Sequence, residues 1–252
     1  MKILLNLSYV GTAYCGYQVQ KNAVSIQQRL NEAAKALFGF ECDIVGCSRT
    51  DKGVHAKMFC ATVSERGKEG IASTIPEGSL PAAFNSYLPG DIAVRSAKYV
   101  EDSFHARYDV KYKEYVYRIY NAQLPDPFLC GRVWHYPRSI SDDSLAKMNK
   151  AASFFVGKYD FSSFMASGSS VSDTVREVVS ARVERQGDVI EFYVAADGFL
   201  YNMVRIMTGT LIAVAEGKIA PLDIPDIIGS KDRSRAGMTA PADGLYLNKV
   251  EY

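Results

Sequence analysis

The sequence has few of the features that mark metal-binding, membrane-spanning or secreted proteins. It contains one Trp, three scattered His and five Cys, and no two of the cysteines form a Cys-x-x-Cys pair. Zinc sites draw on paired ligands at short spacing, so we expect no metal site and read the cysteines as reduced thiols of a cytoplasmic protein. No apolar run approaches the roughly 18 residues of a membrane span, and the N-terminus alternates like a strand rather than a signal peptide. We therefore expect a soluble protein with no membrane contact.

The charge balance excludes little. The formal net charge is +1, and a near-neutral chain can still bind nucleic acid through a local basic surface. With 252 residues, 48% of them hydrophobic, the chain is long enough for one large domain or two small ones. Sixteen Tyr and twelve Phe supply many flat rings, which serve as core or as platforms for stacked bases.

The first half of the chain predicts the element order β-α-β-β-α-β. Ser25-Ile-Gln-Gln28 is a capping box that opens a helix, and Gly39 closes it. Apolar residues recur along that helix at helical spacing. The expected strands are 2–10, 42–48, 57–64 and 92–100, and the expected helices are 26–38 and 80–87.

The second half repeats the same order. The expected strands are 110–120, 175–185, 189–196 and 245–251, the expected helices are 142–156 and 200–216, and 221–243 is an extra piece with its own short helix. The predicted fold class is α+β, with two ferredoxin-like β-α-β-β-α-β halves that form mainly antiparallel sheet backed by helices. The expected domains are 1–104 and 105–252, and the boundary is soft because no Pro/Gly linker separates the halves.

The connection GCSRTDKGVHA, residues 46–56, carries more chemistry than a turn needs. In an extended segment Arg49 and Asp51 share one side while Thr50 points away. Gly53 allows a positive φ and a close approach by another chain. A carboxylate beside a guanidinium on an open loop suits nucleophilic or acid–base work on a large partner. The purely structural alternative is a surface turn stabilised by an Arg–Asp pair.

Two further segments stand out. Arg205 is the only charged residue on the apolar helix 200–215, so it either reaches solvent or pairs with a carboxylate or phosphate, and Asp51 is a candidate. On the strand 111–118, alternate residues mix cations with rings as single-strand binding surfaces do. These residues are Lys111, Lys113, Tyr115 and Tyr117. The structural alternative is a solvated edge strand with aromatic packing.

Together these segments resemble the tRNA pseudouridine synthase A family from end to end. The most specific stretch is SRTDKGVHA (48–56), followed by GFLYNMVRIMTGT (198–210) and APADGLYL (240–247). Supporting stretches are SYVGTAYCGYQVQ (8–20), SFHAR (103–107), KYKEYVYRIYN (111–121) and DFSSF (160–164). Val10 and Tyr17 depart from the family pattern, which commonly has an aspartate and a tryptophan there.

The resemblance implies an isomerase that converts uridine to pseudouridine at positions 38 to 40 of the tRNA anticodon stem-loop. It also implies a homodimer whose two subunits contact one tRNA, with no metal or organic cofactor. By the same resemblance Asp51 is the catalytic aspartate and Arg49 occupies the space left by the flipped nucleotide. Tyr115 packs on the uracil ring, Arg205 pairs with the catalytic carboxylate, and Leu245 lies beneath the base.

The chemistry leaves the role of Asp51 open between attack on ring C6, attack on sugar C1′ and removal of the ribose 2′ proton. Tyr115 is a poor base for the C5 proton unless its pKa is shifted from about 10. Two other functions remain as alternatives. One is a non-catalytic RNA-binding protein or tRNA chaperone on the same fold, and the other is a metal-free hydrolase that uses a carboxylate pair.

Overall fold

The computed structural model describes residues 1–168 and 171–252 and has the α+β class predicted from the sequence. The chain divides into two compact units, Met1–Lys111 with Tyr246–Tyr252, and Tyr112–Leu245. The domain boundary at 104/105 stays a prediction. Within the described residues, no helix has the length and apolar character needed to cross a membrane.

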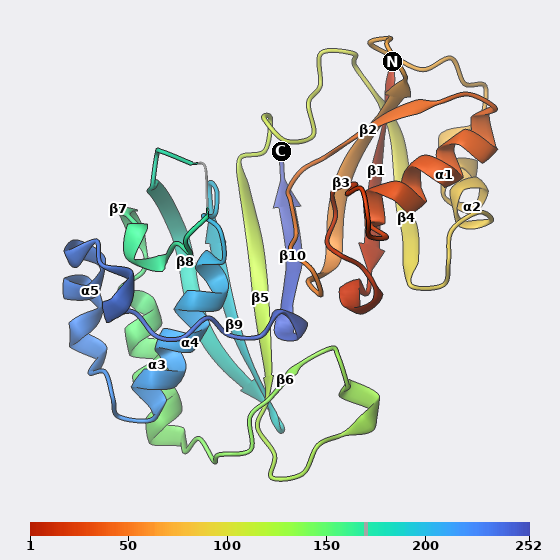
Figure 1. Ribbon diagram of the computed structural model, residues 1–252. Coiled ribbons are helices and arrows are strands. Elements are labelled where there is room, and N and C mark those ends of the chain that lie inside the picture. The colour runs from red at the N-terminus through yellow and green to blue at the C-terminus, as the bar shows by residue number, and fades with distance from the viewer. Residues whose placement is uncertain (169–170) are drawn as a thin grey trace. The chain divides into compact units, whose positions relative to one another are not determined.

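Unit 1 has the predicted β-α-β-β-α-β order. Its elements are β1 (Lys2–Tyr9), α1 (Ile26–Phe38), β2 (Cys42–Gly46), β3 (His55–Glu65), α2 (Leu80–Asn85) and β4 (Ile92–Val100). The strands run antiparallel in the order β4-β1-β3-β2, and α1 and α2 lie against the sheet (Figure 1). Ile3, Leu5 and Leu7 alternate along β1 and are fully buried, which confirms the strand pattern.

Helix α1 forms where local sequence predicts it. The side chain of Ser25 accepts the N–H of Gln28 at 3.2 Å, and Gly39 ends the helix with a φ of 78°. The capping box differs from the prediction in one respect, because the Gln28 amide donates to Glu32 four residues ahead. Ser25 therefore supplies the cap contact that the helix start requires.

One edge of β3 changes partner along its length. Residues 61–65 pair antiparallel with β2, while His55 and Ala56 pair in parallel with Tyr246 and Leu247 of β10 (Leu245–Glu251). The connection from β2 to β3 leaves the sheet between these two pairings. It therefore cannot be a tight hairpin turn, and its extra residues form a loop at the sheet edge.

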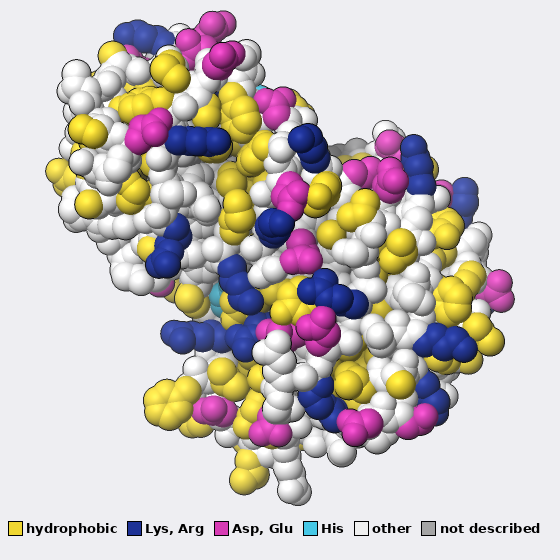
Figure 2. Space-filling view, turned by 180° about the vertical axis from the view of Figure 1, so that it is seen from behind, with side chains coloured by type: hydrophobic (Ala, Val, Ile, Leu, Met, Phe, Trp, Pro, Cys, Tyr) yellow, Lys and Arg dark blue, Asp and Glu magenta, His cyan; other side chains and the backbone are white. Residues whose placement is uncertain are grey.

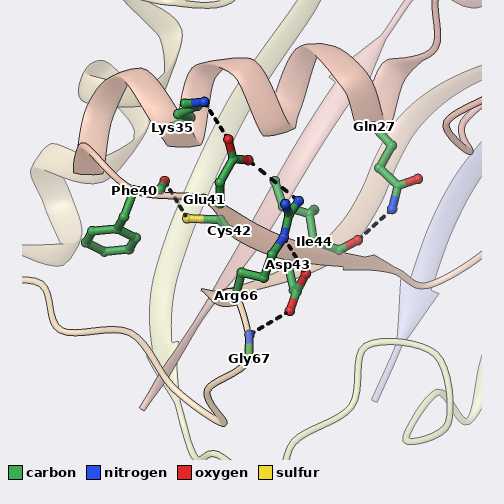
Figure 3. A network of polar contacts seen from close by, with 9 residues as sticks. All are labelled: Gln27, Lys35, Phe40, Glu41, Cys42, Asp43, Ile44, Arg66 and Gly67. Atoms are coloured by element: carbon green, nitrogen blue, oxygen red, sulfur yellow. Dashed lines mark hydrogen bonds and ion pairs between the residues drawn. The ribbon is translucent and has the colours of Figure 1, made fainter.

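Polar side chains make contacts around β2 (Figure 3). Gln27, on α1, donates its amide to the carbonyl of Ile44 at 2.8 Å. Arg66 bridges the carboxylates of Glu41 and Asp43, each at 3.6 Å. The contact from Gln27 occupies one backbone carbonyl of β2 that would otherwise be open to another strand.

Unit 2 also has its sheet backed by helices. Its elements are β5 (Tyr112–Tyr120), β6 (Trp134–His135), α3 (Asp142–Ser153), β7 (Gly157–Asp160), β8 (Val175–Gln186), β9 (Val189–Ala196), α4 (Met203–Ala215) and α5 (Ile224–Ser230). Strands β5, β9, β8 and β7 pair antiparallel in that order, and β6 pairs in parallel with β5. Helix α3 packs on β8 and α4 on β5 (Figure 1). The two short strands β6 and β7 were not predicted.

Helix α4 begins three residues later than predicted. Asn202, at its N-cap, has a φ of 59°, which lies outside the right-handed helical region. Below α3 and α4 the core of unit 2 contains four fully buried phenylalanines, Phe155, Phe161, Phe164 and Phe192. This core fixes the helix that carries Arg205.

Candidate active site

The loop from Ser48 to Val54 buries Thr50 and leaves Arg49 and Asp51 more exposed, as predicted. The N–H of Cys47 donates to the Cys60 carbonyl at 2.8 Å, which extends the β2–β3 pairing by one residue before the loop departs. Thr50 then points inward, with its hydroxyl 2.8 Å from that of Tyr9. Arg49 is exposed and Asp51 is half-buried.

A second loop holds the backbone of the first. The N–H of Tyr17 donates to the Thr50 carbonyl at 3.0 Å, and the N–H of Gly53 donates to the Tyr14 carbonyl at 3.3 Å. The backbone carbonyl of Asp51 accepts the N–H of Val54 at 3.1 Å, which closes a turn. The residues between Arg49 and Val54 are thus bonded on both sides of Asp51.

Two glycines make this close approach possible. A Cβ on Gly16, whose φ is +87°, would lie 2.5 Å from the Thr50 carbonyl oxygen. A Cβ on Gly11 would lie 2.0 Å from the Val54 carbonyl oxygen, closer than any real contact. Gly53 has a φ of 82°, as its position in the motif predicted.

His55 anchors the end of the loop. Its ring is fully buried and stacks on Tyr246, with centroids 4.5 Å apart and planes inclined by 24°. Its Nδ1 accepts the N–H of Gly11 at 2.9 Å, so the proton of the neutral ring is on Nε2. His55 therefore ties the Gly11 segment to β3 and β10.

The surface-turn interpretation of Arg49 and Asp51 is not supported. Among residues 1–168 and 171–252, Arg49 takes part in no ion pair. The loop is held by backbone contacts instead, so its arginine is presented to solvent. Basic and acidic side chains are interspersed on the face of the molecule shown in Figure 2, in keeping with a net charge of +1.

Arg205, in unit 2, is held by two neutral oxygens. Its Nε donates to the carbonyl of Ala240 and its Nη1 to the amide oxygen of Asn202, both at 2.7 Å. The N–H of Ala240 donates back to the Arg205 carbonyl at 3.1 Å. These contacts orient the guanidinium without neutralising its charge, and its pairing with Asp51 stays a prediction.

The segment from Ala240 to Leu245 packs on β5. The hydroxyl of Tyr117 donates to the Pro241 carbonyl at 2.7 Å. A Cβ on Gly244 would lie 2.7 Å from the Tyr117 ring, so only glycine fits there. Leu245 is buried at the end of this segment, where β10 begins.

The predicted binding strand needs one correction. Tyr117 is fully buried and bonded to Pro241, so its ring cannot stack on a base in this structure. Burial raises the pKa of Tyr117 well above its ordinary value, and the nearby charge of Arg205 offsets a part of this. The structural alternative is also wrong, because β5 pairs with β6 and β9 and is not an edge strand.

The other three residues of that strand differ in their surroundings. Tyr115 is buried, and its ring meets that of Phe199 edge-on at 5.0 Å. Lys111 is exposed, just before β5 begins, and Lys113 is half-buried. Lys111 is thus available for phosphate contact, while Tyr115 is largely enclosed by the protein.

Comparison with known proteins identifies the family. The profile of the family described as "tRNA pseudouridine synthase" matches residues 7–109 and 151–252. The chain belongs to this family. It is 47% identical to tRNA pseudouridine synthase A of Thermoanaerobacter sp. (strain X514) over 252 residues, 99% of each chain. It is 44% identical to the protein of that name from Acetivibrio thermocellus over 250 residues, again 99% of each.

A third relative, from Ruminiclostridium cellulolyticum, is 42% identical over 252 residues, covering 100% of this chain and 99% of its own, and has the same name. A solved chain from a Cbf5-Nop10-Gar1 complex aligns with 97% of this chain and 57% of its own, at 12% identity. Its TM-score of 0.37 is too low to establish a shared fold.

Several residues that hold the motif residues in position by direct contact were not identified from the sequence. They are Tyr9, Gly11, Gly16, Asn202, Ala240 and Pro241. Asn202 acts on Arg205 three residues ahead, and the others act through a contact with a residue far away in the chain. The glycines within SYVGTAYCGYQVQ were the available signal, since two of them contact the RTDKG loop.

Proposed function

We propose that this chain isomerises uridine to pseudouridine in tRNA, at positions 38 to 40 of the anticodon stem-loop. Membership of the tRNA pseudouridine synthase family over nearly the whole chain supports the activity. The observation that carries the proposal is the loop of Arg49 and Asp51, whose backbone is held by hydrogen bonds while its arginine has no ion-pair partner among the described residues. Binding alone has no use for such a carboxylate, so a non-catalytic RNA-binding role is less well supported.

Asp51 is proposed as the catalytic carboxylate. It would attack ring C6 or sugar C1′, or remove the ribose 2′ proton, and each role needs a fixed position and an ionised group. The bonds that flank Asp51, to Tyr17 and Tyr14, supply the fixed position. Arg49 is proposed to fill the gap that the target nucleotide leaves in the stack, which offsets the few kcal/mol that flipping costs.

Arg205, Tyr115 and Leu245 are proposed to act on the carboxylate and the base. A guanidinium near a carboxylate favours its ionised form even when a bound base excludes water. The contacts of Arg205 with Ala240 and Asn202 support this role, because they orient the side chain and leave its charge in place. Tyr115 would pack on the uracil ring while it turns, and Leu245 would lie beneath it.

The reaction itself is balanced without a redox partner. The C1′–N1 bond breaks, the ring turns, a C1′–C5 bond forms, and the proton on C5 is released to solvent as N1 takes one up. Nothing is oxidised and no group is transferred, so the proposal includes no cofactor. It does include a homodimer, in which one tRNA contacts both subunits, and a cytoplasmic location.

The test is release of tritium from tRNA that carries [5-³H]uridine, with wild type and Asp51→Asn run in parallel and tRNA binding measured on the same samples. We expect release by the wild type only, with binding nearly equal. Release by both proteins would remove Asp51 from catalysis. Tight binding without release by either would favour the non-catalytic RNA-binding alternative.

A further inference from the structure

A turn in unit 1, residues 105–109, presents an aromatic ring to solvent beside a cation. Tyr108 is 75% exposed, and its ring stacks on that of His105 with centroids 4.2 Å apart and planes inclined by 24°. The guanidinium carbon of Arg107 lies 5.9 Å from the centroid of the same ring. None of these three side chains has a role in the function proposed above.

The turn is held rigidly by its own hydrogen bonds. The Nδ1 atom of His105 accepts the backbone N–H groups of Arg107 and Tyr108, both at 3.1 Å. The N–H of His105 donates to the Asp109 carboxylate at 2.9 Å, and the N–H of Asp109 donates to the His105 carbonyl at 3.1 Å. The exposed ring is therefore fixed before any partner arrives, which lowers the entropic cost of a contact.

The same turn is anchored to the C-terminal residue Tyr252, which follows β10. The hydroxyl of Tyr252 donates to the Ala106 carbonyl at 2.8 Å, and its ring packs on Phe104 at 5.0 Å. The thiols of Cys60 and Cys47 also lie near that hydroxyl. The pKa of Tyr252 is raised, and burial of the side chain is the largest cause. Cys47 immediately precedes the loop of Arg49 and Asp51. Figure 1 shows the C-terminus next to the segment that joins β4 to β5.

An exposed aromatic ring with an adjacent guanidinium matches the chemistry of unpaired nucleotides. Bases stack on aromatic side chains in single-stranded regions, and arginine contacts the neighbouring phosphate. Tyrosine and arginine are also enriched at interfaces between protein subunits, so the test below includes the oligomeric state of the variant. Lys111 is exposed two residues beyond the turn and adds a second cation.

We propose that the turn from His105 to Asp109 is a tRNA contact, in which Tyr108 stacks on an unpaired base and Arg107 binds an adjacent phosphate. The inference rests on tRNA being the substrate. His105 acts as a positioning residue, since it touches the ring and the backbone of the turn. The turn belongs to unit 1, as does the loop that carries Asp51.

The test compares Tyr108→Ala, Tyr108→Phe and Arg107→Gln in the full-length protein, with unmodified tRNA as ligand. We expect Tyr108→Ala to weaken binding about tenfold, equivalent to about 1.4 kcal/mol, as loss of one stacked base requires. Tyr108→Phe retains the ring and should bind within about twofold of wild type. Arg107→Gln should lower the slope of log K against log salt by about 0.7 to 0.9.

Tyr87→Ala is the matched control, because Tyr87 is another exposed tyrosine of unit 1 at 52% exposure. It should leave binding unchanged. If Tyr108→Ala and Arg107→Gln both bind like wild type while the wild type releases tritium, the turn proposal is wrong and the proposed function stands. If the wild type neither binds nor modifies tRNA, the proposed function fails first. A Tyr108→Ala protein that changes oligomeric state in light scattering would mark the turn as a protein interface and overturn the proposal.

Discussion

The hydroxyl of Tyr9 on β1 lies 2.8 Å from the hydroxyl of Thr50, and both side chains are buried. This bond ties a central strand of the unit 1 sheet to the residue between Arg49 and Asp51. Because neighbours in an extended segment point to opposite sides, burying Thr50 turns its two neighbours outward. Thr50 is thus a positioning residue for the candidate active site.

Removing this bond should lower turnover more than stability. We expect Thr50→Val and Tyr9→Phe each to reduce the rate of tritium release about tenfold, with little change in the affinity for tRNA. The cost in unfolding free energy should be about 1 kcal/mol, as for an ordinary hydrogen bond. The measurement is single-turnover kinetics together with urea unfolding.

The matched control is Tyr99→Phe, which removes a tyrosine hydroxyl bonded to Ser73 at 3.0 Å and to Ile75 at 2.8 Å in the same unit. It should cost similar stability with full activity. Equal losses of activity in Tyr9→Phe and Tyr99→Phe would contradict the positioning role of Tyr9.

Replacing Gly16 by alanine should displace the loop. The new Cβ would lie 2.5 Å from the Thr50 carbonyl oxygen, and the backbone φ of +87° is strained for alanine. We expect activity to fall at least a hundredfold, with a loss of about 1–3 kcal/mol in stability. Kinetics and thermal unfolding of the variant check this.

Gly39→Ala is the control that separates the backbone strain of a positive φ from displacement of the loop by a new Cβ. Gly39 also has a positive φ, +78°, but a Cβ there would meet no atom within 4 Å. That variant should lose about 1 kcal/mol of stability and keep its activity. If both variants retain activity, the approach of Gly16 to Thr50 does not position the loop.

Local features of the sequence predicted much of this structure. The cap at Ser25 and the stop at Gly39 depend on neighbours within four residues, and Arg49 and Asp51 share one side because the segment is extended. What the sequence could not predict depends on distant partners. The contact of Tyr9 with Thr50 spans 41 positions, and that of Tyr117 with Pro241 spans 124. The sequence placed Tyr117 on a binding face because it alternates with Lys113 and Tyr115 along the strand. Such alternation does not reveal that a distant segment, here the one containing Pro241, covers the residue.

Arg205 should not tolerate exchange for lysine. Its Nε and Nη1 atoms bond to Ala240 and Asn202 at the same time, and a lysine ammonium cannot reproduce that fork. We expect Arg205→Lys to lower the rate of tritium release about a hundredfold, and Arg205→Leu to lower it further. The affinity for tRNA and the far-UV circular dichroism of the protein should change little.

Arg233→Lys is the control for loss of a guanidinium that makes two hydrogen bonds at the same time. Arg233 also contacts backbone and side-chain oxygens of unit 2, at 2.9 Å to Gly237 and 3.1 Å to Thr239. It should lose stability without a specific loss of turnover. If Arg205→Lys instead behaves like Arg233→Lys, then Arg205 has only a structural role.

Lys111 and Lys113 should contribute unequally to the salt dependence of tRNA binding. Lys111 is exposed and Lys113 half-buried, so we expect Lys111→Gln to lower the slope of log K against log salt by the full value for one phosphate, about 0.7 to 0.9. Lys113→Gln should lower it by less. Binding titrations between low and moderate salt give both slopes, and an unchanged slope for Lys111→Gln would place the RNA surface elsewhere.

Glu216, at the end of α4, should make unit 2 sensitive to acid. Hydrogen bonds from Lys218, then from Tyr136 and Arg138, lower the pKa of its carboxyl to about 2 from an ordinary value of 4.5. Its side chain is 18% exposed. A carboxyl whose folded-state pKa is depressed stabilises the fold above its unfolded pKa, and this contribution is lost as the pH falls from about 4.5 to about 2.

Glu216→Gln should therefore cost about 1–2 kcal/mol at pH 7, after allowance for solvent screening. The difference in unfolding free energy between wild type and variant should shrink through the same pH window, in denaturant titrations at several pH values. Asp143→Asn removes an exposed carboxylate on α3, 2.6 Å from Lys147, and should stay within about 0.5 kcal/mol of wild type. A Glu216→Gln difference that is constant with pH would mean that the carboxyl stabilises unit 2 by its packing rather than by its charge.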